Sequence, residues 1–372
     1  MIPFLDLQRE YRKLQAELAP AIQRVLASGH YILGREVEEF ERQWTAHCQV
    51  PHGVLVASGT DALTLALEAS GTIRPGTGDE VITSAHGSPY TAMAIVRAGA
   101  RPVFADIDPE TWLVNALTIE PVLTPRTRAI IPVHLYGLPC DMRSILDLSR
   151  QRGLTVIEDA CQAHGARYRL EKWQRVGSFG HAAAFSFYPT KNLGCFGDAG
   201  IIVSNDGDLI ERARVLSGGG QRVRDHAVVP GYNSRGDELQ AAILNCKLPH
   251  LEAWNERRRT LAAKYKERLH LPGLRWQPVP ESREHVYHLL VVRHPQRDRL
   301  RAHLRDRGFE TMVHYPVALH RQPAFADSSQ PHLPEAERAA EEVLSLPLQP
   351  DLSEAEVEKV ADAVNEFAAV TA

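Results

Sequence analysis

Two side chains with complementary chemistry follow strand-like segments of this sequence. Asp159 lies at the end of the segment that starts with the apolar residues 154–157, and Lys191 lies in the segment that follows the strand-like residues 182–186. A lysine can form a Schiff base with an aldehyde cofactor, and an aspartate can pair with the protonated ring nitrogen of such a cofactor. Because ligands of open α/β sheets bind at the carboxyl ends of the strands, Asp159 is expected at a ligand-binding edge.

The setting of each residue favours this chemistry. A buried carboxylate needs a positive partner, and each pKa unit by which Asp159 holds a ring proton corresponds to about 1.4 kcal/mol. Lys191 precedes the glycine-rich residues 194–200, where the backbone can approach a bound ring closely. A desolvated lysine beside a cationic cofactor has a lowered pKa and supplies a free amine. Taken singly, an aspartate at a strand end is more often a turn or cap residue, and most lysines are solvated surface charges.

A third candidate is Gly59, between the apolar residues 54–56 and a helix-like segment at 61–69. Gly59 permits close approach of the backbone, and Thr60 or Asp61 can cap the helix that follows. A helix N-terminus with free N–H groups is an anion site, so these residues predict a place for a cofactor phosphate. The alternative is an ordinary helix cap.

The elements that position these residues follow from apolar runs separated by helix-like stretches. Continuously apolar strands between helices predict a three-layer α/β domain with a largely parallel sheet, covering residues 1–249. The predicted strands are residues 54–56, 81–83, 102–105, 129–133, 155–157, 182–186 and 201–203. A strand-like segment at 287–292 and an amphipathic helix over 357–367 predict a smaller α/β domain at residues 250–372.

Composition excludes several classes of function. The 42 lysine and arginine residues against 46 aspartate and glutamate residues give a net charge of −4, with no basic stripe for nucleic acid. Five scattered cysteines without Cys-x-x-Cys spacing indicate reduced thiols in a cytoplasm. No signal peptide and no apolar stretch long enough to span a membrane are predicted. The protein is therefore expected in the cytoplasm, without a membrane partner.

Three further kinds of site are disfavoured. His134, His164 and His181 lack metal-ligand spacing, so no metal is expected. The glycines at 218–220 follow a helix-like segment rather than a strand, which argues against a dinucleotide site. Ser186 has no Gly-x-Ser-x-Gly elbow, which argues against a serine hydrolase.

Taken together, these segments resemble those of the DegT-type sugar aminotransferases, a branch of the fold-type I pyridoxal 5'-phosphate (PLP) enzymes. The similarity runs through nearly the whole chain, at residues 4–7, 28–34, 58–62, 132–137, 158–165, 186–192, 231–235 and 314–316. The resemblance implies that Lys191 holds PLP as a Schiff base and then acts as the base for the proton shift. It also implies that Asp159 pairs with the pyridinium nitrogen and that Gln162 reaches the phenolic oxygen.

The same resemblance implies roles for further residues. Gly59, Thr60 and Ser186 would hold the cofactor phosphate, and Asn233 would reach the phosphate in the neighbouring subunit, so a homodimer with shared active sites is expected. An amino acid, usually L-glutamate, would donate the amine to a keto sugar carried on a nucleotide. The candidates on the substrate side are Tyr31, His314, Tyr315 and His320.

Residues 28–34 and 231–233 resemble those of family members that aminate at C3, which implies a substrate such as a dTDP-3-keto-6-deoxyhexose. The alternatives are a 4-keto nucleotide sugar, a keto-inositol, or a non-catalytic regulatory relative. A sugar dehydratase of this family carries histidine in place of the lysine, so Lys191 argues against it.

Two positions depart from the family pattern. Ser88 stands where relatives have an aromatic residue that stacks on the cofactor ring, so either His86 or Tyr90 substitutes for it or that face is open. Residues 71–77 form a longer connection than usual.

Overall fold

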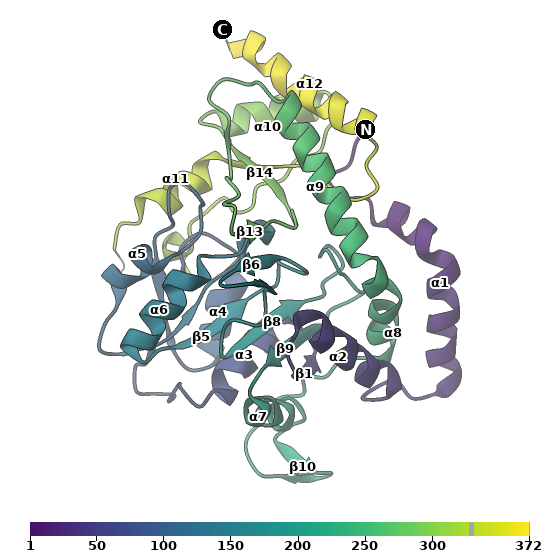
Figure 1. The fold of residues 1–372 in the computed structure, drawn as a ribbon, viewed down its shortest axis with the longest axis vertical. Coiled ribbons are helices and arrows are strands. Elements are labelled where there is room, and N and C mark those ends of the chain that lie inside the picture. Colours follow the sequence, from purple (N-terminus) through teal and green to yellow (C-terminus); the bar gives the residue numbers. More distant parts are fainter. Residues whose placement is uncertain (327–330, 372) are drawn as a thin grey trace.

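A seven-stranded sheet forms the centre of the molecule (Figure 1). The computed structural model describes residues 1–326 and 331–371. The strand order is β1-β9-β8-β5-β4-β2-β3, and β9 alone runs antiparallel to its neighbours. The strands are β1 (His52–Val56), β2 (Glu80–Ser84), β3 (Arg101–Ala105), β4 (Thr127–Ile131), β5 (Thr155–Asp159), β8 (Ala182–Ser186) and β9 (Gly200–Ser204). Each overlaps a strand predicted from an apolar run, with ends that differ by up to two residues.

Helices bury both faces of this sheet, which confirms the predicted three-layer architecture. Alternate strand residues such as Val54, Ile157 and Ile202 pack in one core cluster with α3 (Gly59–Ala69), α4 (Pro89–Arg97) and α7 (Gly207–Ser217). Their neighbours Val156 and Phe185 face the opposite layer. That layer contains α2 (Arg35–Cys48), α5 (Ala116–Ile119), α6 (Met142–Arg152) and α8 (Glu238–Lys247). Each strand contains a mostly apolar run because neither face of the sheet meets water.

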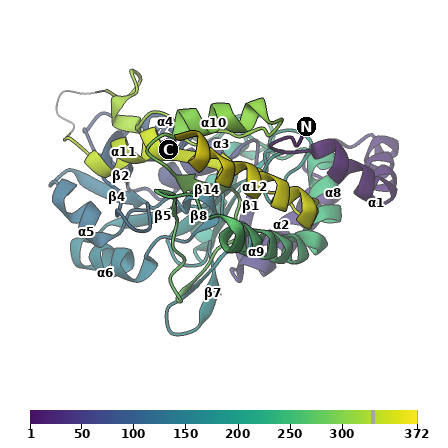
Figure 2. The ribbon, with the colours of Figure 1, turned by 90° about the horizontal axis from the view of Figure 1, so that it is seen from above.

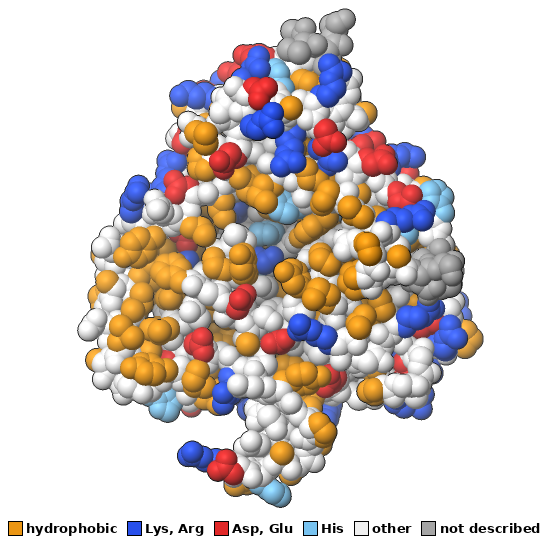
Figure 3. All heavy atoms as spheres, turned by 180° about the vertical axis from the view of Figure 1, so that it is seen from behind, with side chains coloured by type: hydrophobic (Ala, Val, Ile, Leu, Met, Phe, Trp, Pro, Cys, Tyr) orange, Lys and Arg blue, Asp and Glu red, His pale blue; other side chains and the backbone are white. Residues whose placement is uncertain are grey.

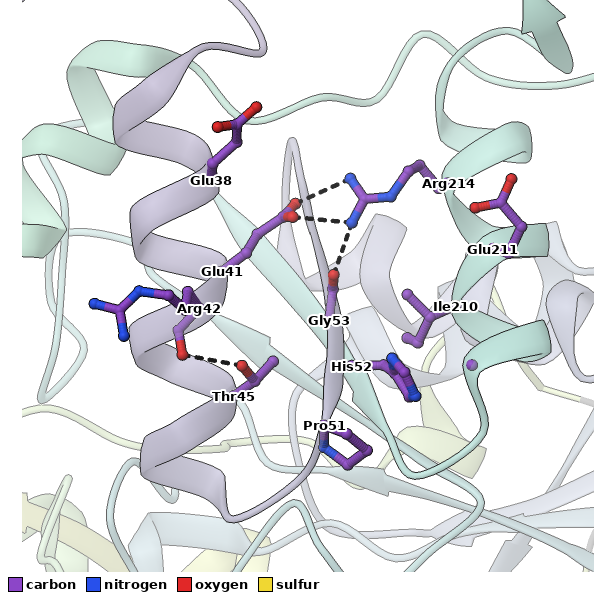
Figure 4. A pocket seen from close by; sticks show the side chains of 11 residues that line it. Glu38, Glu41, Arg42, Thr45, Pro51, His52, Gly53, Ile210, Glu211 and Arg214 are labelled. Atoms are coloured by element: carbon purple, nitrogen blue, oxygen red, sulfur yellow. Dashed lines mark hydrogen bonds and ion pairs between the residues drawn. The ribbon is translucent and has the colours of Figure 1, made fainter.

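Two helices in the first 50 residues, α1 (Leu7–Ser28) and α2, have no counterpart among the predicted elements. Helix α1 packs along α8, and α2 packs on both α8 and β1. On the outer rim, Glu41 of α2 accepts a hydrogen bond from the backbone N–H of Leu55 at 2.7 Å. Arg214 of α7 pairs with Glu41 at 2.9 Å and donates to the Gly53 carbonyl (Figure 4). These bonds tie α2 and α7 together across the edge strand β1.

A second, smaller group of elements lies at the other end of the molecule (Figure 1). Its core combines Ile2 with residues between 261 and 367. The elements are α9 (Leu251–Arg268), α10 (Arg297–Asp306), α11 (Pro334–Glu342), α12 (Glu354–Thr371) and a sheet of β12 (Arg275–Trp276), β14 (Leu290–Arg293) and β15 (Val343–Leu346). The strand predicted at 287–292 begins only at Leu290. The domain boundary at residue 250 stays a prediction.

Two hairpins project from this framework. Strand β6 (Arg167–Arg169) pairs with β7 (Trp173–Arg175) on one side and with β13 (Arg283–Glu284) on the other, and the turn between β6 and β7 extends from the body (Figure 2). Strands β10 (Gln221–Val223) and β11 (His226–Ala227) form a hairpin beyond α7. Within the described residues, no helix has both the length and the apolar character that crossing a membrane requires.

Candidate active site

Adjacent parallel strands bring Asp159 and the Lys191 loop to the same edge of the sheet. Asp159 is the last residue of β5, and it pairs in register with Ala184 of β8. Lys191 lies in the loop that follows β8, where its backbone N–H donates to the Tyr188 carbonyl at 2.9 Å. The structure therefore places the two predicted residues in one site at the carboxyl ends of the strands.

The Asp159 carboxylate is buried and held in a defined orientation. Its side chain is 5% exposed. Thr91 of α4 donates its hydroxyl to Oδ2 at 2.6 Å, and the backbone N–H of Cys161 donates to Oδ1 at 3.2 Å. Thr91 was not among the predicted site residues, because nothing in the local sequence signals a contact across 68 positions.

The amine of Lys191 is available for reaction. Its Nζ atom makes no hydrogen bond or ion pair with any residue that the structure describes. Burial lowers the pKa of Lys191, although the nearby Cys161 and Asp159 act in the opposite direction. A lowered pKa increases the fraction of free amine near neutral pH, and the free amine is the form that attacks an aldehyde.

Gly59 and Ser186, both predicted to bind the cofactor phosphate, lie in close contact and form a cradle at the start of α3. A Cβ atom on Gly59 would lie only 2.6 Å from the Ser186 Cβ and 3.0 Å from the Cys161 Sγ, so this position tolerates only glycine. Gly59 and Thr60 open α3, and Asp61 N–H donates to Ser58 Oγ at 3.1 Å. The cap is therefore Ser58, and the prediction of Thr60 or Asp61 as the cap was wrong. Both residues lie inside the first turn, whereas Ser58 has the extended backbone that a cap needs.

Gln162 links the cofactor side of the site to Tyr315. Its Oε1 accepts the backbone N–H of Tyr136 at 2.7 Å, and its Nε2 donates to the Tyr315 hydroxyl at 3.0 Å. Burial raises the pKa of Tyr315 to about 12, so its phenol stays protonated. His314 is next to it, with Nδ1 against Ser345 Oγ at 2.8 Å, and burial followed by the charge of Lys191 lowers the pKa of His314 to about 4.

The remaining predicted residues lie outside this cluster. His320 is 3% exposed, and its Nε2 pairs with Glu337 at 2.8 Å. Tyr31 is 49% exposed, and Asn233 is also exposed. Within the described part of the chain, no group of three or more His, Cys, Asp and Glu residues is arranged to hold a metal ion.

The position usually filled by a stacking aromatic is occupied differently here. Ser88 lies close enough to the Tyr315 hydroxyl to affect its pKa. His86 points into the interior, where its Nε2 lies 2.7 Å from the Tyr136 hydroxyl. Tyr90 is 59% exposed. Of the two predicted substitutes, His86 thus contacts Tyr136, which bonds to Gln162, and Tyr90 lies at the surface. Tyr315 contacts both Gln162 and Ser88.

These observations fit a bound PLP molecule. A buried carboxylate for the ring nitrogen, an unpaired amine for the aldehyde, and a glycine cradle at a helix N-terminus for the phosphate occur together. Gln162 adds an amide donor beside them.

Replacement of Tyr315 by phenylalanine tests which side of the site this residue serves. Loss of the hydroxyl leaves Gln162 Nε2 with one partner fewer, so PLP affinity is expected to fall about three- to tenfold, the effect of one hydrogen bond. PLP titration followed by absorbance measures this change. An unchanged PLP affinity with a raised KM for the sugar substrate would instead place Tyr315 on the substrate side alone.

Comparison with known proteins identifies the family. The model of the DegT/DnrJ/EryC1/StrS aminotransferase family matches residues 12–365. The chain is 47% identical to a dTDP-3-amino-3,4,6-trideoxy-alpha-D-glucose transaminase of Streptomyces venezuelae, over 99% of this chain and 96% of that protein. It is 42% identical to a UDP-N-acetyl-3-dehydro-alpha-D-glucosamine 3-aminotransferase of Acidithiobacillus ferrooxidans, over 98% and 97% of the two chains.

Solved structures agree with this result. The crystal structure of S. venezuelae DesV in complex with a ketimine intermediate has a TM-score of 0.94 at 47% identity, covering 99% of this chain and 98% of that one. The structure of the NtdA protein of Bacillus subtilis with bound cofactor PMP has a TM-score of 0.91 at 31% identity, covering 99% and 85%. This chain therefore belongs to the DegT/DnrJ/EryC1/StrS aminotransferase family.

Proposed function

We propose that this aminotransferase moves an amino group from L-glutamate to the C3 keto group of a nucleotide-linked deoxysugar, in the class of a dTDP-3-keto-6-deoxyhexose. The observation that carries the proposal is a pattern among relatives that are 40–47% identical. Five of them carry names that place the amino or keto group at C3, and three of these five are dTDP-sugar transaminases, from Streptomyces venezuelae, Aneurinibacillus thermoaerophilus and Micromonospora megalomicea. The cofactor is PLP, which supplies an electron sink for the carbon that loses a proton.

Each residue of the site has a separate role in the proposed reaction. Lys191 anchors the cofactor and later moves the proton at the reacting carbon, for which its lowered pKa suits it. Asp159, oriented by Thr91, keeps the ring nitrogen of the cofactor protonated. Gln162, whose Nε2 also donates to Tyr315, donates to the phenolic oxygen of the cofactor. Gly59, Thr60 and Ser186 bind the phosphate. We place His314 on the substrate side and Tyr315 at the border between substrate and cofactor. Tyr31 and His320, which lie outside the cluster, are substrate-side candidates on the resemblance alone.

We further propose a homodimer in which Asn233 completes the neighbouring subunit's phosphate site. Large hydrophobic side chains are exposed near this residue in sequence and on elements paired with its segment: Tyr31, Ile32, Leu33, Val228, Val229 and Tyr232. Figure 3 shows hydrophobic side chains gathered over the middle and one flank of one broad face. Apolar patches of this kind mark protein interfaces. The cytoplasmic location stays a prediction from the sequence.

Complementation between two inactive variants tests the shared site. Asn233→Asp puts a negative charge beside the phosphate, and Lys191→Ala removes the amine, so each variant alone is expected to be inactive. Coexpressed with different tags, the two form heterodimers with one intact site, and activity is expected to recover to about a quarter of the parent's in a statistical mixture. Absence of recovery in purified heterodimers would place Asn233 in its own subunit's site.

An assay of amine transfer tests the substrate. Purified protein with PLP and glutamate is offered 3-keto and 4-keto dTDP- and UDP-sugars and a keto-inositol, and formation of 2-oxoglutarate is measured. Transfer to the 3-keto nucleotide sugars is expected. Preference for a 4-keto sugar or the keto-inositol would overturn the assignment at C3.

A regulatory role is the second candidate, because a relative 45% identical over 98% of this chain is named a pleiotropic regulatory protein of Geobacillus stearothermophilus. Absence of transfer to every acceptor, with PLP still bound, would favour it.

A further inference from the structure

His288 lies at the active site although neither its sequence context nor the comparisons assign it a role. It belongs to the segment between β13 and β14 and is 8% exposed. This segment packs against the Tyr136–Gly137 turn, where Val286 N–H donates to the Gly137 carbonyl at 3.1 Å. A Cβ atom on Gly137 would lie 3.0 Å from the backbone nitrogen of His288 and 3.1 Å from the backbone carbonyl oxygen of Gln162. The segment is thus held directly against the residues that orient Gln162.

A chain of amides determines which His288 nitrogen carries the proton. Asn192 uses Nδ2 to donate to Asn255 Oδ1 at 2.8 Å and to the Val286 carbonyl at 3.0 Å. Asn255 is oriented in turn, because its own Nδ2 donates to the His164 carbonyl at 2.8 Å. The Asn192 Oδ1 is therefore an acceptor, and it lies 3.2 Å from His288 Nδ1. Nδ1 must carry the hydrogen, which leaves Nε2 with a free lone pair.

The surroundings keep this imidazole neutral. The titratable and charged groups that act on it are Lys191, Arg258, His164 and His314. Burial, followed by the charge of Lys191, lowers the pKa of His288 well below its usual value. A neutral ring with Nδ1 protonated can only accept a hydrogen bond at Nε2.

The Nε2 atom is free to accept a hydrogen bond. It makes no hydrogen bond with any described residue, yet it is not sealed in the interior as the unpaired Nδ1 atoms of His86 and His164 are. Asn192, which holds the opposite side of the ring, directly follows Lys191 in the chain. The Lys191 amine, on a flexible four-carbon stem, lies near enough to both groups that its charge acts on His288 as well as on the cofactor-side residues Cys161 and Asp159.

We propose that His288 is a positioning residue whose Nε2 accepts a hydrogen bond from the Lys191 amine whenever that amine is released from the cofactor. The lysine amine then has two binding positions, one at the cofactor and one at His288. The proposal rests on the aminotransferase function, in which the cofactor alternates between its aldehyde and amine forms. His288 would hold the released amine close to the face where it next acts.

Two amide substitutions test the roles of the two ring nitrogens separately. In His288→Asn the side-chain amide can still bond to Asn192 but does not reach Lys191, whereas in His288→Gln the longer amide offers an oxygen at the position of Nε2. With each protein loaded with pyridoxamine 5'-phosphate, labelling of Lys191 by acetic anhydride is followed by mass spectrometry as a function of pH. This readout needs no sugar substrate, so it stays informative even if the proposed sugar is wrong.

The expected result is a difference between the two variants. A hydrogen-bond acceptor stabilises the ammonium form and raises the pKa of the lysine, so its loss in His288→Asn lowers the pH midpoint of labelling by about one unit. His288→Gln keeps the midpoint of the parent. An unchanged midpoint in His288→Asn, or an equal shift in both variants, overturns the proposal.

A measurement on the unaltered protein covers the case in which a variant fails to fold. With ¹⁵N-labelled histidine, the Nε2 resonance of His288 is expected to move upfield when the aldehyde form of the cofactor is converted to the amine form, because Nε2 gains a hydrogen bond. A resonance that does not move overturns the proposal.

Discussion

Replacing Lys191 with alanine is expected to lower kcat/KM for amine transfer by at least about 10⁴-fold, because one side chain both anchors the cofactor and moves the proton. Its amine is partly buried and makes no bond with any described residue, so its removal should cost little stability. The rate of 2-oxoglutarate formation measures the loss. Borohydride treatment of the parent is expected to fix the cofactor on Lys191, and the variant should take up no such label.

Lys172→Ala is the matched control, since Lys172 is an exposed lysine in the turn between β6 and β7. It is expected to keep the parent's rate and labelling. Undiminished turnover in Lys191→Ala, or a borohydride label on a different residue, would assign the reaction to another amine.

Replacing Asp159 with asparagine is expected to lower kcat/KM by about 10³-fold. The amide can still accept the hydrogen bond that Thr91 donates to Oδ2, so the local structure should be retained. It carries no charge, however, and the ring nitrogen of the cofactor would lose the partner that keeps it protonated. Initial rates together with the absorption spectrum of the bound cofactor across pH measure the two consequences.

Asp208→Asn is the control for this change, because Asp208 is exposed in the first turn of α7. Its rates and spectrum should match the parent's. A spectrum and rate in Asp159→Asn that match the parent would mean that the ring nitrogen is held by a different group.

The sequence alone was sufficient to predict the framework of the site. The seven strands could be recognised because each is buried on both faces and therefore contains a run of mostly apolar residues, a property that any short window of sequence records. The placement of Asp159 and of the Lys191 loop at the carboxyl ends of β5 and β8 follows from those strands. The resemblance added the family, which the match over residues 12–365 confirms.

Two boundaries of helices and strands were predicted incorrectly, because neighbouring residues offer alternative positions for the same feature. The cap of α3 is Ser58 rather than Thr60 or Asp61, because a cap depends on the backbone conformation of one residue and all three are good capping types. Strand β14 begins at Leu290 and not at Tyr287, since residues 286–289 bond to the Tyr136–Gly137 turn instead of to β15.

Only the tertiary structure decided which side chains meet around the cofactor position. The Thr91–Asp159 bond spans 68 residues and the Gln162–Tyr315 bond spans 153, and the Asn192–His288 pair joins the large sheet's loop to the segment before β14. Periodicity records whether a residue is buried, and it carries no information about which distant residue lies opposite. That information arises when the chain packs, so the chemistry of Lys191 and Asp159 could be read from the sequence, whereas the neighbours that tune them could not.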